Sequence, residues 1–446
     1  MSGQQGEYTN GGGPSFCPIA RFASVKNNAN WSSQRIHRSL YFEVGTSLIC
    51  PAEVRLRAAG REEKVLLKIT NQARDYAWGS RTLISDYFGI AATGKPMAEI
   101  WFGTHPVSPA VLEGKPDVTL TEQLKGHQLS FLLKILAADE ALSIQAHPNS
   151  EQAQQGFLRE NQMGISLDAP TRNYRDDKHK PEIIVALSDF QALCGFRPIA
   201  EIQQILNDLN THSQSSGALV ELSAGWLRLL NGENGLQKLF SDIANRRGNF
   251  DGIAAELSSM ADFDSRFALA EQLNKIYPGD PGVLLALFMN HVFLEPGESL
   301  FLPAGNIHAY LSGLGVEVMA SSDNVLRGGL TSKHIDVLEL EAVLNFEPMP
   351  VPKVKPIELS SGLIHYPCDT DDFLLYRIEP NGQRVMAEIS LPGESIILCT
   401  AGDVAISNSL EESQILRRGE AAYLSGEAKY FNLSGSGTAF LAASTR

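Results

Sequence analysis

The stretch EPGESLFLPAGNIHAYL, residues 295–311, shows the pattern that sets the fold class of this chain. Apolar runs alternate here with turns rich in glycine and proline, as is typical of short β-strands joined by tight turns. The pattern returns in LPGESIILCTAGDVAI, residues 391–406, and in RGEAAYLSGEAKYF, residues 418–431. Repeated units of this length predict two related β-barrels of the double-stranded jelly-roll kind.

The two predicted barrels differ at one chemically important position. When Gly419 is superposed on Gly297, His308 falls opposite Tyr430. Only the first barrel therefore keeps a histidine at this place.

The rest of the chain divides by its hydrophobic period. Residues 65–196 carry short apolar runs broken by Gly, Pro and Asn, which predict strands, with a helix expected at FLLKILAADE, residues 131–140. Between residues 198 and 289 the apolar residues recur at three- and four-residue spacing, so a helical module is expected. We predict a first barrel domain at 66–197 and 290–348, a helical domain at 198–289 and a C-terminal barrel domain at 349–446.

Residues 1–65 have a different composition. They are rich in Gly, Asn and Ser, and no acidic residue lies between Glu7 and Glu43. We expect a disordered extension; a targeting segment, or sequence translated upstream of the true start, are the alternatives.

Bulk composition excludes several classes of protein. With 446 residues, 43% of them hydrophobic, the chain is long enough for two or three globular domains. Its formal net charge of −14 argues against nucleic acid or an anionic membrane as a partner. No apolar run reaches the roughly 20 residues that span a bilayer. The five cysteines are scattered without a CxxC pair, which favours a reducing compartment, and we expect a cytoplasmic location.

Three strand-like stretches share an alternation of polar side chains. The alternating residues are Ser143, Gln145 and His147 in SIQAHP, Lys180 and Glu182 in KHKPEIIVAL, and Asn306, His308 and Tyr310 in LPAGNIHAYL. Because a barrel points one face of each strand inward, these sets could meet in its interior. Two imidazoles, a carboxylate and an amide oxygen would suit a divalent metal, with Zn²⁺ expected. From spacing alone, hydrogen-bonded core histidines are an equal alternative.

Taken together, these motifs resemble the type I mannose-6-phosphate isomerase family. The resemblance rests on SIQAHPN, KPEIIVAL, LPAGNIHAYL and NVLRGGLTSKHID in this order, with YAWGS and MAEIWFGTHP before them. It covers residues 66–446, whereas residues 1–65 have no counterpart. The resemblance implies a cupin-type catalytic domain, a helical domain and a C-terminal cupin-like domain.

The resemblance also implies a set of site residues. One zinc ion per chain is expected on Gln145, His147, Glu182 and His308, with no metal in the C-terminal domain. Arg327 is expected to be catalytic. The residues expected at the substrate and its phosphate are Ser143, Lys134, Lys333 and Tyr310. Lys134 could instead extend its charged end from an apolar stretch to solvent, and Lys333 could be a solvated lysine at a helix start.

The implied reaction interconverts D-mannose 6-phosphate and D-fructose 6-phosphate through an enediol-type intermediate, so a base must move a proton between C2 and C1. The candidate bases are His179, Lys180, Glu317 and Asp323, and the last two could instead support the metal ligands. Structural roles are expected for Trp78, Trp101, His105 and His291, with stacking against the sugar as the alternative for the two tryptophans. A sugar-phosphate-binding cupin without catalysis and an Fe(II) cupin oxygenase are the alternative functions. The sugar phosphate is the only partner expected, and the oligomeric state is left open, with a monomer expected.

Overall fold

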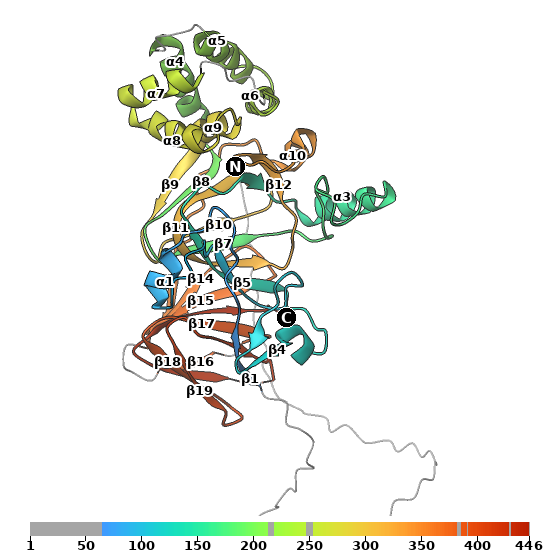
Figure 1. Ribbon diagram of the computed structural model, residues 1–446, viewed down its shortest axis with the longest axis vertical. Helices are drawn as coiled ribbons and strands as arrows, with labels where there is room; N and C mark the ends of the chain where they lie inside the picture. The colour runs from blue at the N-terminus through green and yellow to red at the C-terminus, as the bar shows by residue number, and fades with distance from the viewer. Residues whose placement is uncertain are drawn as a thin grey trace, which may run out of the picture. The chain divides into compact units, whose positions relative to one another are not determined.

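The computed structural model describes residues 65–212, 218–246, 253–380, 385–389, 391–427 and 430–445. The extension predicted at residues 1–65 lies, but for its last residue, outside this part of the chain. Residues 62–446 form one compact unit. Within it, layers of β-sheet are stacked from the C-terminal strands up to a group of helices (Figure 1).

Two sheets contain the C-terminal strands. The C-terminal sheet has the order β13 (Ile357–Ser360), β14 (Leu363–Tyr366), β15 (Leu374–Ile378), β22 (Thr438–Ala443), β17 (Ser395–Ala401), β20 (Ala421–Leu424), β1 (Leu66–Thr70), β3 (Val111–Leu112) and β4 (Lys115–Thr119). The outer sheet has the order β16 (Val385–Ile389), β21 (Phe431–Gly435), β18 (Asp403–Asn408) and β19 (Ser413–Arg417). Strands from residues 66–119 thus pair with strands from beyond residue 349, and the predicted domain boundaries stay predictions.

The central sheet and its branch lie on the other side of the C-terminal sheet. The central sheet has the order β10 (Ser299–Leu302), β7 (Glu182–Ala186), β11 (His308–Ala320), β5 (Phe131–Ala138) and β2 (Glu99–Phe102). The branch consists of β6 (Ile144–Ala146), β8 (Phe190–Phe196), β9 (Met289–Leu294) and β12 (Leu326–Gly329). Among the described residues, neither the central sheet with its branch nor the C-terminal sheet closes into a ring. The cupin-type strands therefore form open sheets rather than the barrels expected.

Alternating apolar residues hold the layers together. In β17, Ile397 and Cys399 pack against the outer sheet, whereas Ile396 and Leu398 pack against the central sheet. Because both faces are buried, the strand reads as a continuous apolar run in the sequence. A further apolar cluster, which includes Leu136, fills the space between the central sheet and the branch.

The predicted helix at residues 131–140 is wrong. Residues Phe131–Ala138 form β5, whose eight residues are all buried. Leu133 and Ile135 face the C-terminal sheet, and Leu132 and Leu136 face the opposite side. An apolar run that is buried on both faces carries no two-residue alternation, and this is why the sequence resembled a helix.

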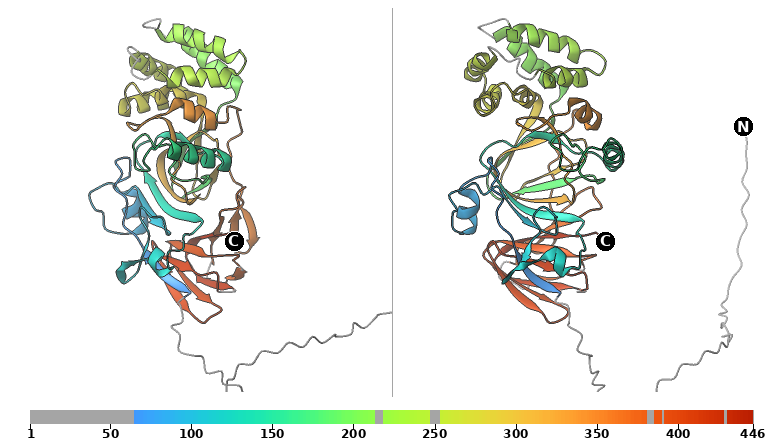
Figure 2. Two further views of the ribbon diagram at one scale, coloured as in Figure 1. Left: turned by 90° about the vertical axis from the view of Figure 1, so that its right-hand side faces the viewer. Right: turned by 45° about the vertical axis from the view of Figure 1, so that its right-hand side comes forward.

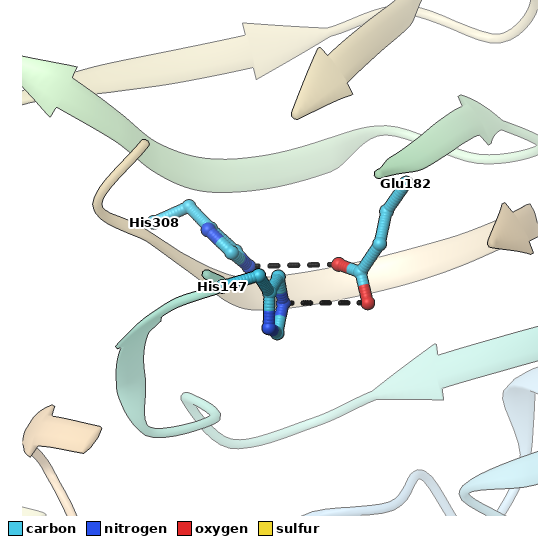
Figure 3. A group of neighbouring side chains, drawn as sticks. All are labelled: His147, Glu182 and His308. Atoms are coloured by element: carbon cyan, nitrogen blue, oxygen red, sulfur yellow. Dashed lines mark ion pairs between the residues drawn. The ribbon is translucent and has the colours of Figure 1, made fainter. Parts of the chain in front are cut away.

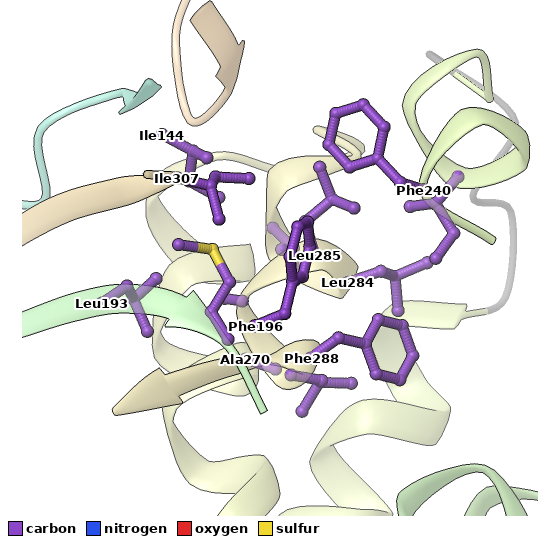
Figure 4. Close-up of a cluster of buried hydrophobic side chains, with 14 of the residues drawn as sticks. Ile144, Leu193, Phe196, Phe240, Ala270, Leu284, Leu285, Phe288 and Ile307 are labelled. Carbon is purple, nitrogen blue, oxygen red and sulfur yellow. The ribbon is translucent and has the colours of Figure 1, made fainter. Parts of the chain in front are cut away.

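Helices cover the far face of the branch. They are α4 (Ile199–His212), α5 (Ala218–Leu230), α6 (Gly235–Ala244), α7 (Ile253–Phe263), α8 (Ala268–Ile276) and α9 (Gly282–Leu285), with short 3-10 helices at Ser265–Phe267 and Ala286–Phe288. Their apolar faces pack on Ile144, Leu193 and Ile307 of the branch region (Figure 4). The remaining helices are α1 (Leu83–Phe88), α2 (Leu120–Gln123), α3 (Ser150–Gln162) and α10 (Val337–Val343). Figure 2 shows the helices at one end of the stack and α3 projecting from its side.

The internal repeat predicted from the sequence is visible in the backbone. Gly297 and Gly419 have φ angles of +93° and +90°, which favour glycine. Each lies two residues before a four-residue strand, β10 in one case and β20 in the other.

No helix in the described part of the chain is long and apolar enough to cross a membrane.

Candidate active site

Strand register brings three of the predicted residues into one row. Gln145 of β6 pairs with His308 of β11 on one side and with Arg327 of β12 on the other. Directly opposed residues point to the same face of a sheet. The apolar neighbours Ile144 and Ala146 point the other way, into the cluster under the helices. The alternation in SIQAHP therefore separates a polar face from a core face, as predicted.

His147, Glu182 and His308 converge at the end of this row (Figure 3). Nε2 of His147 and Nε2 of His308 each lie 3.5 Å from a different oxygen of the Glu182 carboxylate. Nε2 of Gln145 lies 3.3 Å from Nε2 of His308. All three of the converging residues are at most 2% exposed, so solvent does not satisfy their polar atoms.

Hydrogen bonds leave these side chains with free lone pairs. Nδ1 of His147 donates to the backbone oxygen of Asn324 at 2.7 Å, and Nδ1 of His308 donates to that of Asn306 at 3.0 Å. Each neutral imidazole therefore presents an unprotonated Nε2. Nε2 of His147 and Oε2 of Glu182 are buried without a hydrogen-bond partner among the described residues. Such a costly arrangement fits a divalent cation held by two imidazoles and a carboxylate.

Electrostatics keep the cluster in the protonation state that a metal needs. Burial, and next the positive charge of Lys180, lower the pKa of His147 to about 4. Burial alone would raise the pKa of Glu182, but Lys180 at 2.8 Å and the neighbouring His147 hold it well below its usual value. At neutral pH the cluster therefore offers a neutral His147 imidazole and the Glu182 carboxylate.

A second row, on the central sheet, faces the first. Trp101 of β2, Lys134 of β5 and Glu317 of β11 are opposed in register. Nζ of Lys134 lies 2.9 Å from Glu317 and 3.6 Å from Glu99, and it is 5.1 Å from the ring centre of Trp101. Burial alone would lower the pKa of Lys134, but Glu317 and Glu99 raise it above its ordinary value. Lys134 is buried and ion-paired, so the alternative in which it extends to solvent is wrong.

Between the two rows lies a cavity of about 370 Å³. The predicted residues that line it are Lys134, Gln145, Lys180, Glu182, Tyr310, Glu317, Asp323, Arg327 and Lys333. His147 and His308 lie behind this surface. His179 and Ser143 are not among the lining residues: His179 forms an ion pair of 2.7 Å with Asp372, and the Ser143 hydroxyl lies 3.5 Å from Oε1 of Gln145.

A family model and individual relatives both match this chain, and they point to the same family. Residues 66–199 match the family model for the catalytic domain of type I phosphomannose isomerase. Mannose-6-phosphate isomerase of Salmonella typhimurium is 34% identical over 391 residues, covering 83% of this chain and 97% of that protein. The Homo sapiens enzyme is 33% identical over 411 residues, covering 79% and 91%. This chain belongs to the type I mannose-6-phosphate isomerase family.

Solved structures of the family superpose on most of the chain. The crystal structure of a mannose 6-phosphate isomerase with zinc and yttrium has a TM-score of 0.78 at 33% identity, covering 86% of this chain and all of that one. The Salmonella typhimurium enzyme bound to fructose 6-phosphate and zinc gives the same score and coverage. Metal and sugar phosphate thus occur together in isomerases of this fold.

The isomerase cavity also contains two residues for which structural roles were expected, and one that the sequence did not indicate. His105, expected to be structural, lines the cavity and its Nε2 lies 3.3 Å from Oδ1 of Asp323. Trp101 also lines the cavity, and its indole N–H donates to Glu99 at 2.9 Å. Arg175 lines it from the loop that precedes β7. This loop has no hydrophobic period, so its charged residues read as solvated, and only the nearby family motif KPEIIVAL marked the region.

Tyr310 has an unusual position in the isomerase cavity. Tyr310 is 3% exposed, and its hydroxyl has no hydrogen-bond partner among the described residues. Burial and then the charges of Glu317 and Glu182 raise its pKa well above the ordinary value, so it stays a neutral donor. A buried donor of this kind is suited to a hydroxyl of a bound sugar.

Proposed function

We propose that this chain interconverts D-mannose 6-phosphate and D-fructose 6-phosphate. The observation that carries the proposal is the buried His147, Glu182 and His308 cluster at a cavity with basic side chains, in a chain of the isomerase family. A binding protein without catalysis would not need to bury two unpartnered ligand atoms, whose desolvation costs free energy. An Fe(II) oxygenase is disfavoured because the related structures hold zinc.

Gln145, His147, Glu182 and His308 would hold one Zn²⁺ in this proposal. Gln145 would complete the set once its amide turns Oε1, rather than Nε2, toward His308. When bound, zinc supplies a Lewis acid that can polarise the oxygens on C1 and C2 of the sugar. The protein itself fixes the ligands, since the Nδ1 atoms of both imidazoles are held by backbone oxygens.

Different side chains of the cavity would carry out proton transfer and stabilise the developing negative charge. Proton transfer between C2 and C1 needs a base that the substrate can reach. Asp323 has a side chain that is 37% exposed, whereas those of Lys180 and Glu317 are 8% and 3% exposed and held in ion pairs. We therefore favour Asp323 as the base, held in place by His105. Arg327 stays positively charged at any working pH and would stabilise the oxygen that gains negative charge.

The direct test is an assay of the purified protein with mannose 6-phosphate. We expect fructose 6-phosphate to form, and we expect a chelator to stop the reaction and added Zn²⁺ to restore it. Metal analysis should give one equivalent per chain, because the C-terminal domain is predicted to bind none. Asp323→Asn should lower turnover by about 100-fold or more while zinc content is kept. Failure of the wild-type protein to convert the sugar would leave a sugar-phosphate-binding role.

A cytoplasmic location and a monomeric state stay predictions within this proposal. Cys194 and Cys399 are buried free thiols and Cys368 is a half-buried one, as expected in a reducing compartment. Light scattering of the full chain would test the monomer.

A further inference from the structure

Three positive side chains line the cavity without forming an ion pair in the described part of the chain. Arg175, Arg327 and Lys333 all line it, and none of the three forms an ion pair with a carboxylate in the described part of the chain. We call them the cationic rim, because Arg175 and Lys333 are exposed and Arg327 is half-buried. In a chain with a formal net charge of −14, three cations without an ion pair at one cavity are unusual.

The cations of the rim are close enough to repel one another. Burial and then the charge of Arg175 lower the pKa of Arg327. Burial and then the charges of Arg327 and Arg175 lower the pKa of Lys333. This repulsion costs free energy unless an anion occupies the space between the groups.

Three carboxylates of the cavity do not provide that anion, because each already has a cationic partner. Glu99 and Glu317 are paired with Lys134, and Glu182 is paired with Lys180, whereas Asp323 contacts the His105 imidazole. Lys134, placed near the phosphate by family resemblance, is thereby neutralised by two carboxylates. The cations of the cavity that lack an ion pair lie on the rim, so the rim is where an anion is attracted.

The position of Arg175 is fixed relative to the metal cluster by one buried residue, Asn324. The Arg175 backbone N–H donates to Oδ1 of Asn324 at 2.7 Å, and Nδ2 of Asn324 donates to the backbone oxygen of Asp176 at 2.9 Å. The backbone oxygen of the same Asn324 accepts from Nδ1 of His147. The loop and a predicted metal ligand are thus held by one residue, three positions before Arg327.

We propose that Arg175 is a specificity-determining residue of this isomerase, whose guanidinium binds the substrate's phosphate dianion together with Lys333, while Arg327 keeps its role at the reacting carbons. One Nη1 donor is used by the backbone oxygen of Leu167 at 2.8 Å, which leaves further N–H groups for phosphate oxygens. A sugar phosphate bound in this way extends from the rim toward Glu182, so its reacting carbons lie at the metal cluster. The inference rests on the proposed function, because it assigns the substrate's phosphate to a place in that cavity.

The test compares Arg175→Ala, Arg175→Lys and Lys178→Ala in the zinc-loaded full chain. Lys178 is a matched control, since it is exposed on the same loop but does not line the cavity. Arg175→Ala should raise the KM for mannose 6-phosphate about tenfold or more and weaken competitive inhibition by inorganic phosphate by a similar factor. Turnover at saturation should change by less than about threefold. Arg175→Lys should recover part of the loss, and Lys178→Ala should match the wild type.

Each other outcome counts against the inference. Wild-type KM and wild-type phosphate inhibition in Arg175→Ala would overturn it. A loss of zinc or of turnover without weaker phosphate inhibition would mean that Arg175 only supports the loop, and would overturn it as well. If the wild-type protein does not isomerise the sugar, the proposed function fails separately, and calorimetric titration of inorganic phosphate into the wild type and Arg175→Ala still decides the role of Arg175.

Discussion

At the scale of single residues, one strand-to-strand row contains both predicted metal ligands and the predicted catalytic arginine. Gln145 lies between His308, a predicted metal ligand, and Arg327, which faces the cavity. Neighbours in this row have different expected roles, so substitutions of adjacent residues should fail in different ways. The role of each residue can therefore be tested by which property its substitution changes, zinc binding or turnover.

We expect Gln145→Ala to weaken zinc binding by more than about tenfold, because the site loses one donor. Arg327→Ala should keep one zinc per chain and lower turnover by about 100-fold or more, since an oxyanion would lose its charged partner. Zinc content after dialysis against a weak chelator, measured beside kcat, separates the two effects. Arg327→Ala with near-normal turnover, or Gln145→Ala with unchanged zinc affinity, would contradict these assignments.

At the scale of elements, the site depends on the way β11 changes partners along its length. Its first residues pair with β6 and β8, and its later residues pair with β5 and β7. The change occurs around Gly313, which has a φ angle of +116°. One strand therefore delivers His308 to the metal cluster and Glu317 to the opposite wall of the cavity.

Gly313→Ala should disrupt this change of partners. A Cβ atom there would lie 2.5 Å from the backbone oxygen of Asp189, and an L-residue is strained at this φ angle. We expect a loss of about 3 kcal/mol or more in the free energy of unfolding, measured by denaturant titration. Gly94→Ala is the matched control, because Gly94 also has a positive φ of +73° but nothing within 4 Å. It should cost only about 1 kcal/mol; equal losses in the two variants would show that the crowding at Gly313 is unimportant.

The elements also differ in how well the sequence pattern predicted them. Alternation was enough to predict the polar face of SIQAHP, because the other face of that short strand packs under the helices. It failed for β5, where both faces are buried and the strand lost its two-residue period. The change of pairing partners at Gly313 and the failure of the sheets to close depend on contacts between distant segments. The local sequence pattern does not encode such contacts. Arg175 was missed for the same reason, since Asn324 holds its loop from 149 residues further along the chain.

At the scale of the whole molecule, the C-terminal part of the chain contacts the segment before β7 through an ion pair. Nε2 of His179, just before β7, lies 2.7 Å from Oδ2 of Asp372, just before β15. The C-terminal sheet also contains β1 from the start of the described residues, paired with β20. The C-terminal strands are thus part of the framework under the cavity, although no catalytic role is predicted for them.

The ion pair makes a prediction about stability and pH. The hydrogen bond to Asp372 is the main cause that raises the pKa of His179 above its ordinary value. A group whose pKa is raised by folding stabilises the folded state fully below the unfolded pKa of about 6.5, and this contribution is lost as pH rises through the folded pKa. The wild type should therefore exceed His179→Gln in stability by about 0.5–1 kcal/mol at pH 6, since the His179 side chain is one-third exposed.

Denaturant titrations of wild type and His179→Gln at pH 6, 7.5 and 9 would measure this difference, which should shrink toward pH 9. His127→Gln is the control: His127 pairs with Glu394 at 2.6 Å, but its side chain is 58% exposed, so its substitution should cost less at pH 6. A difference that grows with pH would contradict the ion-pair account. Turnover measured on the same variant decides the remaining question about His179, because a candidate base must change kcat, whereas a residue that only joins β7 to the C-terminal sheet changes stability.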